Sequence, residues 1–275
     1  MTIIRVYHVE VARLHLFEFE DLPRFPRVWR DLLRDLLAFN LESARAYDPI
    51  VPRLADALRR TSSARTLDLC SGSSGTSLRV FDRVSEHLGE PVEAVLTDKY
   101  PNLSAFERLV HGRENYQYVS ESVDVLAVTP TLQGFRTIFT AFHHFRPEQA
   151  AQILQDAVDR REPIAVFEFT ERHVLPLLMT LFLPLAAFVN TLRIRPMTAR
   201  RLLWTYLVPI IPLALTWDGF VSGLRSYDPD ELWRIVGQLE GADAYTWDIG
   251  RTERRKDGFC VTYLIGVPVD RSQVN

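Results

Sequence analysis

Two carboxylates stand at the ends of two stretches whose composition predicts strands. Asp68 lies near the end of "RTLDLC", residues 65–70, and Asp98 ends "PVEAVLTD", residues 91–98. The first stretch continues into "SGSSG", where small side chains leave backbone groups free to contact a ligand lying flat against the chain. In related sheets an acid at the end of the second strand binds both hydroxyls of a ribose. The spacing therefore indicates a nucleoside site.

The same turn lacks the sequences that bind phosphate. A P-loop needs a lysine where the helix starts, but Gly75-Thr76-Ser77 stands there. A dinucleotide fingerprint needs three closely spaced glycines, and only Gly72 and Gly75 are present. Two carboxylates without a phosphate-binding lysine fit a nucleoside that carries positive charge, with Asp68 facing a cationic amino-acid group. S-adenosylmethionine is such a molecule.

Strands and helices alternate on both sides of this turn. Strands are predicted at 65–70, 91–98, 115–125, 135–142 and 163–170, with helices at 75–89, 102–112 and 146–161. A helix at 228–241 and two strands at 244–252 and 258–269, joined by a short charged turn, complete the pattern. Such alternation predicts an α/β fold with a parallel sheet that ends in an antiparallel hairpin. Ligands of these sheets bind at the carboxyl ends of the strands.

Two regions lie outside the alternation. The pattern of residues 1–22 predicts irregular structure or short strands. Residues 27–60 have a helical pattern that Pro52 breaks into two helices. We therefore expect an N-terminal helical cap at 1–60 before a domain at 61–275. Residues 172–227 are strongly apolar and form an insertion after the fifth strand.

Composition narrows the class of protein. The 275 residues are 47% hydrophobic and 24% charged, as in a globular protein with one large domain. The net charge of −3, with both signs mixed along the chain, argues against nucleic acid as a partner. Two distant cysteines, Cys70 and Cys260, without CxxC or HExxH spacing, predict neither a disulfide framework nor a metal site. Charges near the N-terminus argue against a signal peptide, so we expect a cytoplasmic protein.

Five segments resemble, in order and spacing, the motifs of class I S-adenosylmethionine-dependent methyltransferases. They are "TLDLCSGSSG", "AVLTDKYPN", "SVDVLAV", "FTAFHHFRPEQAAQILQDA" and "IAVFEFTER". More narrowly, "DLCSG", "LTDKYPN", "FHHF" and "WDG…LRSY" resemble a bacterial branch of that family. The resemblance covers roughly residues 60–171 and 228–270 and implies a Rossmann-like, seven-stranded sheet with a terminal antiparallel hairpin.

The resemblance implies S-adenosylmethionine as the cofactor, held at the carboxyl ends of the first four strands. The implied contacts are Asp68, Cys70, Ser71, Gly72, Ser73, Gly75, Asp98, Lys99, Asp124, Val125, Ala141 and Phe142. Asp98 would bind the ribose hydroxyls, Asp124 the exocyclic amine of adenine, and residues 141–143 would lie below the sulfonium. The family's E/D-x-G-x-G-x-G pattern is not complete, because Cys70 and Ser74 replace two glycines. A side chain at Cys70 narrows the turn.

His143 and His144 are the candidates for a general base. Methyl transfer needs mainly an aligned nucleophile and a site without water, and it needs a base only when the acceptor arrives protonated. Both histidines follow the fourth strand, at the edge where ligands bind, and histidine is the natural base at neutral pH. The alternative is that one of them packs in the turn after the strand.

Other candidates lie in and after the fifth strand. Glu168 is a carboxylate at an otherwise apolar strand position, so we expect it to contact substrate or to pair with Arg172. Trp217, Asp218 and Arg225 end the insertion, where "TWDGFVSGLRSY" is expected to fold back over the pocket and contact substrate.

The insertion carries two uncharged runs, 174–192 and 202–217, joined by the basic "RIRPMTARR". Buried lid helices are the favoured interpretation, because apolar runs this short often form core helices. An apolar patch on a membrane surface through 174–217, a two-helix membrane hairpin and a homodimer contact are the alternatives. Each favours a hydrophobic ligand or partner over a polar one.

The sequence therefore predicts an S-adenosylmethionine-dependent methyltransferase. Its expected acceptor is a small hydrophobic molecule, methylated at oxygen or carbon. The alternatives are a non-catalytic cofactor-binding or membrane-associated interaction protein, and an enzyme that uses the cofactor without transferring a methyl group.

Overall fold

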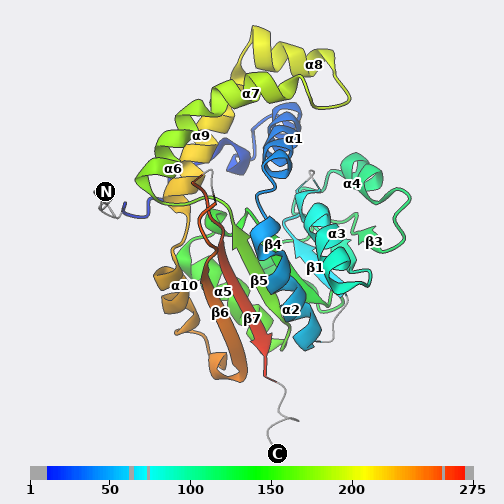
Figure 1. Ribbon diagram of the computed structural model, residues 1–275, viewed down its shortest axis with the longest axis vertical. Coiled ribbons are helices and arrows are strands. Elements are labelled where there is room, and N and C mark those ends of the chain that lie inside the picture. Colours follow the sequence, from blue (N-terminus) through cyan, green and yellow to red (C-terminus); the bar gives the residue numbers. More distant parts are fainter. Residues whose placement is uncertain (1–10, 62–64, 73–74, 256–257, 270–275) are drawn as a thin grey trace, which may run out of the picture.

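A seven-stranded sheet forms the centre of the computed structural model, which describes residues 11–61, 65–72, 75–255 and 258–269 (Figure 1). The strands are β1 (Arg65–Leu69), β2 (Glu93–Leu96), β3 (Tyr116–Tyr118), β4 (Phe135–Phe139), β5 (Ile164–Glu168), β6 (Tyr245–Arg251) and β7 (Thr262–Pro268). Their order is β3-β2-β1-β4-β5-β7-β6. The first five are parallel, and β7 pairs antiparallel with β5 and β6. The predicted Rossmann-like sheet with a terminal hairpin is confirmed.

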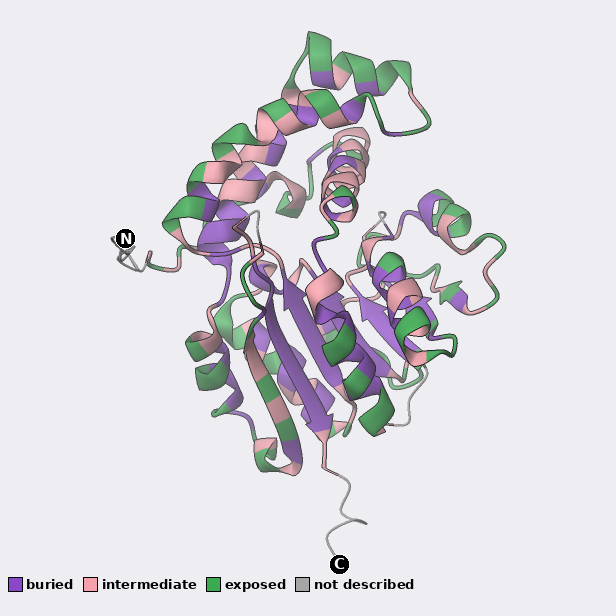
Figure 2. Cartoon of the chain, in the orientation of Figure 1, coloured by how far each residue is buried: buried purple, intermediate pink, exposed green. Residues whose placement is uncertain are grey.

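Helices cover both faces of this sheet. They are α2 (Val51–Thr61), α3 (Thr76–Leu88) and α4 (Leu103–Val110) on one face, and α5 (Pro147–Asp159) and α10 (Pro229–Val236) on the other. Along β5 the side chains alternate between the two cores, with Ala165 and Phe167 in the first and Ile164 and Val166 in the second. Figure 2 shows the central strands buried between these layers, whereas the edge strand β6 is partly exposed. A parallel sheet covered in this way keeps only its strand ends accessible.

The third strand is shorter than the sequence predicted. We expected a strand over 115–125, but β3 ends at Tyr118 and the chain then crosses exposed residues at 120–122. The physical reason is that β3 is an edge strand, which pairs on one side only and gains little from being longer. Asp124 instead begins a short 3-10 helix at Val125–Ala127.

A third layer stands above the carboxyl ends of the strands. It contains α1 (Arg27–Ser43), α6 (Val174–Met179), α7 (Leu183–Thr191), α8 (Ala199–Leu202) and α9 (Ile210–Arg225). Leu33 and Leu36 of α1 share an apolar cluster with Ala187, Ile211 and Leu215 of the insertion. The two helices expected in the N-terminal cap therefore have different neighbours, since α1 packs on the insertion and α2 packs on α3 and the sheet.

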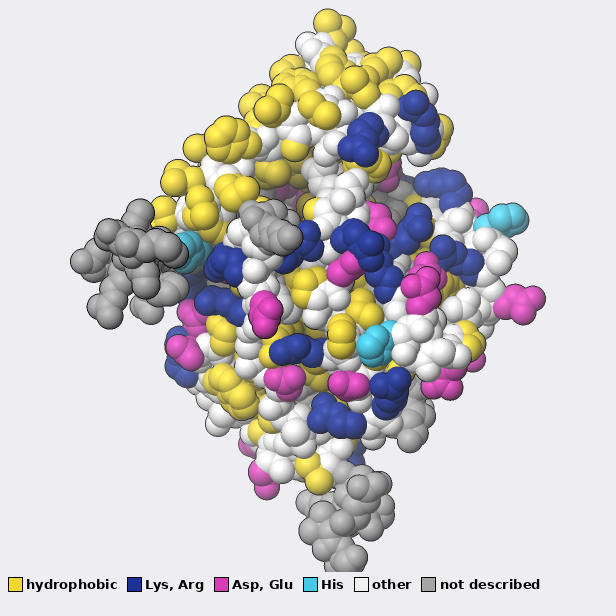
Figure 3. Space-filling view, in the orientation of Figure 1, with side chains coloured by type: hydrophobic (Ala, Val, Ile, Leu, Met, Phe, Trp, Pro, Cys, Tyr) yellow, Lys and Arg dark blue, Asp and Glu magenta, His cyan; other side chains and the backbone are white. Residues whose placement is uncertain are grey.

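The insertion contains one helical stretch, Val174–Thr191, that is long and apolar enough to cross a membrane, and 22% of it is buried. A second would exist only if Ala199–Leu207 and Ile210–Arg225, which are bent by 70°, acted as one span. Figure 3 shows hydrophobic side chains gathered over the insertion, whereas the sheet domain below it carries mixed charges.

Candidate active site

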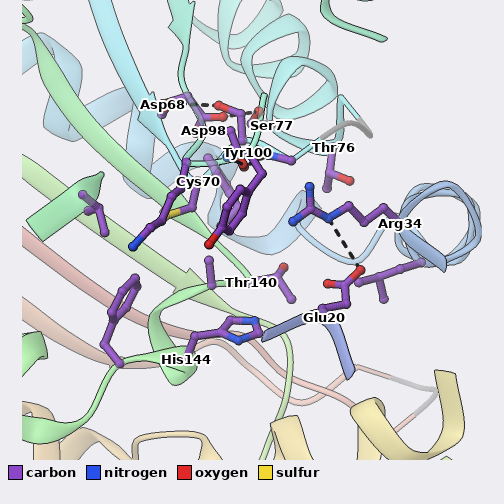
Figure 4. A pocket seen from close by; sticks show the side chains of 18 of the residues that line it. Glu20, Arg34, Asp68, Cys70, Thr76, Ser77, Asp98, Tyr100, Thr140 and His144 are labelled. Carbon is purple, nitrogen blue, oxygen red and sulfur yellow. Dashed lines mark hydrogen bonds and ion pairs between the residues drawn. The ribbon is translucent and has the colours of Figure 1, made fainter. Parts of the chain in front are cut away.

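Two cavities meet above the carboxyl ends of β1, β4 and β5. The first, of about 330 Å³, lies over the turn between β1 and α3 (Figure 4). The second, of about 450 Å³, lies between the ends of β4 and β5 and the inner faces of α1, α6, α7 and α9. The two share wall residues, which are Glu20, Leu37, Leu41, Thr140 and His144. A ligand in one cavity can therefore contact a ligand in the other.

Most of the predicted cofactor residues line the first cavity. They are Asp68, Cys70, Ser71, Gly72, Asp98, Lys99, Asp124, Val125 and Ala141. Ser73 lies outside the described residues. Phe142 is fully buried below the cavity, where its ring contacts Phe145 and Tyr227. Gly75 directly precedes α3 as its N-cap and has a φ of 68°, a conformation that favours glycine.

Asp68 anchors the floor of the first cavity. Its side chain is buried, and its two oxygens accept hydrogen bonds from Ser77 Oγ at 2.6 Å and Thr137 Oγ1 at 2.8 Å. Burial raises the pKa of Asp68 to about 6, although these hydroxyls stabilise the charge. The carboxylate thus links β1 to α3 and β4. Its remaining lone pairs can accept hydrogen bonds from a ligand.

Asp98 holds the glycine turn against the end of β2. Its Oδ2 accepts the amide of Gly72 at 2.8 Å, and its Oδ1 accepts the amide of Tyr100 at 2.7 Å. Each oxygen keeps a second lone pair, so the carboxylate can still accept two hydroxyl groups from a ribose. Figure 4 shows Asp68 and Asp98 together on one side of the cavity, with Glu20 and Arg34 on the other.

Cys70 occupies a backbone conformation that ordinarily requires glycine. Its φ is 59°, and Gly72 follows with a φ of 64°. Residue 70, where the family pattern has glycine, therefore has a left-handed backbone conformation. The cysteine side chain adds steric strain to that conformation. Burial raises the pKa of the Cys70 thiol well above its usual range, so the thiol stays neutral.

Lys99 and Asp124 form an ion pair at the edge of the first cavity. Lys99 Nζ lies 2.7 Å from Asp124 Oδ2, and Asp124 Oδ1 accepts the amide of Leu126 at 3.1 Å. Burial alone would raise the pKa of Asp124, but the lysine and the amide hold it below its ordinary value. An ionised acceptor therefore stands beside Val125, where the adenine contact was predicted.

His143 and Glu168 form a buried pair at the second cavity. His143 Nδ1 lies 2.8 Å from Glu168 Oε2, and Glu168 Oε1 accepts the amides of Phe142 at 2.6 Å and His143 at 3.1 Å. Burial would raise the pKa of Glu168, but His143 and these amides hold it below its usual value. A hydrogen bond to an ionised carboxylate favours a proton on Nδ1, and in the neutral imidazole Nε2 is then the acceptor.

The Nε2 atom of His143 has no hydrogen-bond partner among the described residues. The nearest acid, Glu18, has its Oε1 at 3.8 Å. The expected alternative pairing of Glu168 with Arg172 is wrong, because Arg172 instead binds Asp228 at 2.8 Å and Glu231 at 3.0 Å. The pairing of β4 with β5 brings His143, which follows β4, next to Glu168 at the end of β5.

Residues 13–21 cross the outside of both cavities and are held by the three residues predicted to contact substrate. Asp218 accepts the amides of Phe19 at 2.8 Å and Glu20 at 3.4 Å, and Trp217 Nε1 donates to the carbonyl of Phe17 at 3.0 Å. Asp218 also lines the second cavity. We call residues 13–21 the N-terminal strap.

Arg225, the last residue of α9, binds the charged side chains of the strap. Its Nη1 lies 3.1 Å from Glu18 Oε1 and 2.6 Å from Asp21 Oδ2, and His144 Nδ1 lies 2.8 Å from Asp21 Oδ1. Burial raises the pKa of Glu18 to about 7, although His144 and Arg225 oppose it. The strap therefore brings an acid with a raised pKa next to His143.

Four more charged residues line the two cavities without having been predicted from the sequence, and they are Glu18, Glu20, Asp21 and Arg34. Glu20 pairs with Arg34 at 3.5 Å on one side of the first cavity. The available signal was the alternation in "HLFEFED", which puts Glu18 and Glu20 on one side of an extended segment.

Glu18, His143 and His144 could also approach a metal ion, since one ligand atom from each lies within 4.8 Å of the others. The guanidinium of Arg225 at 3.1 Å from the Glu18 carboxylate already supplies positive charge there. A cation would have to overcome that repulsion, so we assign no metal to this group.

No protein-family model matches the sequence, and no curated protein matches it either. Among solved structures, magnesium protoporphyrin IX methyltransferase (ChlM) from Synechocystis PCC 6803 with bound SAM is similar over 93% of this chain and 100% of that chain, with 8% identity and a TM-score of 0.50. The plantazolicin methyltransferase BamL, in complex with a triazolic desmethylPZN analog and SAH, is similar over 87% and 97%, with 9% identity and a TM-score of 0.48. The pyocyanin biosynthetic protein PhzM is similar over 82% of this chain and 56% of that chain, with 12% identity and a TM-score of 0.47. The first likeness shows that this chain has the fold of class I methyltransferases.

Proposed function

We propose that this protein is an S-adenosylmethionine-dependent methyltransferase that acts on a small hydrophobic acceptor. The observation that carries the proposal is the shared wall of the two cavities at Thr140 and His144. The first cavity has carboxylates suited to a cationic nucleoside, and the second is largely apolar and adjoins a histidine base. Two reactants bound side by side gain the effective concentration on which such a transfer depends.

The first cavity fits the cofactor by its chemistry. Asp98 would accept the ribose hydroxyls, Asp124 the exocyclic amine of adenine, and the backbone of the turn at 70–72 would lie along the methionine. S-adenosylmethionine supplies a methyl group on a positively charged sulfur, which a nucleophile accepts by in-line displacement. Buried acids near that charge favour its binding, because opposite charges attract strongly in a site of low dielectric.

The second cavity fits an apolar acceptor that carries one ionisable group. Its wall includes Leu177, Leu183 and Leu215 from the insertion, and its volume of about 450 Å³ suits a molecule of drug-like size. His143 Nε2 would take the proton from an acceptor hydroxyl, and Glu168 would hold the imidazole in the tautomer that can do so. The insertion and the strap would exclude water during the transfer.

We propose oxygen or carbon as the methylated atom, because a hydroxyl or an acidic C–H that arrives protonated must lose its proton to a base. A phenol or hydroquinone loses its proton to a histidine more readily than an aliphatic alcohol does. The proposal includes a cytoplasmic location, which composition alone supports.

Calorimetric titration with S-adenosylmethionine and with S-adenosylhomocysteine tests the cofactor assignment. Wild-type protein should bind both, and Asp98→Ala should weaken binding by at least about tenfold, because two hydrogen bonds to a charged group are lost. Asp56→Ala is the matched control, since Asp56 is an exposed acid on α2. Absence of heat with either ligand, at up to millimolar concentration, would contradict the cofactor assignment. Unchanged affinity in Asp98→Ala would contradict the ribose assignment alone.

The acceptor assignment needs a separate assay. Purified protein is incubated with S-adenosylmethionine and a panel of lipophilic phenols and hydroquinones, and S-adenosylhomocysteine is quantified. His143→Ala should lower turnover by about 10² to 10⁴-fold with any accepted compound. Turnover of polar acceptors in preference to apolar ones would count against the proposed substrate class.

A further inference from the structure

The outward face of the insertion is an apolar stripe. Its members lie along Val174–Thr191 and the residue after it, and they are Leu175, Leu178, Phe182, Leu185, Val189 and Leu192. Their spacing of three and four residues puts them on one side of a helix. Each is more than half exposed, from 52% for Leu175 to 69% for Phe182. We call this set the outer stripe.

A second exposed apolar segment lies next to the outer stripe. Residues 202–208 begin at the last residue of α8 and include Leu207, which is 78% exposed. Tyr206 packs on Phe188 of α7 with a ring distance of 5.7 Å, so the two segments adjoin. Figure 3 shows their side chains merging into one hydrophobic surface at the end of the molecule farthest from the hairpin. A continuous apolar surface of this kind marks an interaction site.

Folding does not require this surface, because the opposite faces of the same helices already form the core. Leu177 and Leu183 turn inward and line the second cavity, and Ala187 is buried against α1. Asn190 Nδ2 of α7 donates to Asn40 Oδ1 of α1 at 2.8 Å, which holds α7 on the protein. The helices are thus anchored on one side and apolar on the other.

The charged side chains within residues 174–217 all have one sign. Residues 174–217 contain no Asp or Glu, but they contain four arginines. Arg193, Arg195 and Arg200 are exposed, whereas Arg201 is buried and pairs with Asp35 at 2.7 Å. An apolar helix face beside exposed arginines matches the interface of an anionic bilayer, where acyl chains and phosphates lie next to each other.

We propose that the outer stripe and residues 202–208 dock this protein on an anionic lipid bilayer without crossing it. A second copy of the chain fits less well, because a twofold contact would bring two sets of exposed arginines together with no acid in either segment. A membrane-spanning hairpin would have to break the contact between Asn190 and Asn40 and empty the core beneath α7. Docking puts the wall of the second cavity at the lipid surface, so a lipid-soluble acceptor would enter from the bilayer. Only this consequence rests on the proposed function.

Vesicle sedimentation tests the docking without cofactor or acceptor. The full chain is mixed with vesicles of phosphatidylcholine alone, or with about a quarter phosphatidylglycerol. We expect binding at least about tenfold tighter to the anionic vesicles. The double variant Phe182→Glu and Leu185→Glu should bind at least about tenfold more weakly. Trp233→Glu, a large exposed side chain on α10, is the matched control and should bind as the wild type does.

A second variant tests the electrostatic contribution to vesicle binding. Arg193→Glu combined with Arg195→Glu should abolish the preference for anionic vesicles and leave the melting temperature unchanged, since both side chains are exposed. No binding to either vesicle, or undiminished binding by the Phe182 and Leu185 variant, would overturn the proposal. A concentration-dependent dimer without vesicle binding would identify a second copy as the partner instead. Resistance of bound protein to alkaline carbonate would identify a spanning segment. Because no cofactor is present, each failure leaves the methyltransferase proposal intact.

Discussion

The Nδ1 atom of His143 lies 2.8 Å from Oε2 of Glu168, while the other oxygen of that carboxylate accepts two backbone amides. The carboxylate is therefore fixed by the main chain and in turn fixes the imidazole. His143 lines the second cavity, whose wall is largely apolar, and its buried Nε2 has no hydrogen-bond partner among the described residues. This arrangement assigns Glu168 a positioning role, in place of the direct contact with substrate that its strand position left open.

Glu168→Gln should lower kcat by about 10²-fold once an acceptor is known, because the glutamine no longer favours the proton on Nδ1. The double variant with His143→Ala should be no slower than His143→Ala alone, since the two residues act as one unit. Steady-state kinetics measures both effects, and calorimetry should show nearly unchanged cofactor affinity. Additive losses in the double variant would mean that Glu168 acts independently of His143.

Cys70→Gly should be more stable than Cys70→Ala by about 1 kcal/mol, measured by urea denaturation. Both substitutions remove the thiol, but alanine keeps a Cβ at a φ of 59°, whereas glycine adopts that conformation without strain. The difference in stability between the two variants therefore measures the backbone strain at residue 70. Equal stabilities would show that the turn relaxes around a side chain.

The sheet was predictable because each strand and helix carries its own local signal. β5 is an apolar run that ends at Glu168, whereas β1 and β4 combine apolar residues with Asp68 and Arg136. Asn102 and Asp228 accept hydrogen bonds as helix caps where their sequences indicate. The position of Asp98 followed from topology, since the ends of parallel strands meet at one edge. These inferences need no knowledge of distant contacts.

The strap was not predictable, because its contacts join residues about two hundred positions apart in the chain. Glu18 binds Arg225, and Asp218 binds the amides of Phe19 and Glu20. In the sequence the strap has only a strand-like alternation, and no sheet partner appears for it. Asp218 and Arg225 were identified from their place near the pocket, but their bonding partners depend on the tertiary fold.

Asp218→Ala should release the strap and increase its cleavage by trypsin. Loss of the acceptor for two backbone amides lowers the free energy of local opening by about 1.4 kcal/mol, which corresponds to about tenfold faster cleavage. Mass spectrometry of the products, with cuts expected after Arg13 and Arg24, measures the rate. Asp218→Asn keeps one acceptor oxygen and should lie between the wild type and the alanine variant. Cleavage elsewhere at an equal rate would show general unfolding rather than release of the strap.

Stability should fall as pH rises toward 8, in part because of Glu18. Burial raises the pKa of Glu18 from 4.5 to about 7 in the folded protein, so the folded state binds more protons than the unfolded state between these values. Its contribution is complete below about pH 4.5 and is lost as pH passes through about 7. Asp218, with a pKa raised to about 7 by burial, acts in the same direction.

Glu18→Gln isolates that contribution from the other groups in contact with it, which include His143, His144, Asp21 and Arg225. His15 acts in the opposite direction, because burial lowers its pKa to about 4, so the wild-type curve alone is ambiguous. Between pH 5 and pH 8 the wild type should lose on the order of 2 kcal/mol more than the glutamine variant, a difference of several degrees in Tm. Differential scanning calorimetry across that range measures it. Parallel curves for the two proteins would mean that Glu18 is ionised in the folded state throughout, and that the strap holds a full negative charge next to His143 across this pH range.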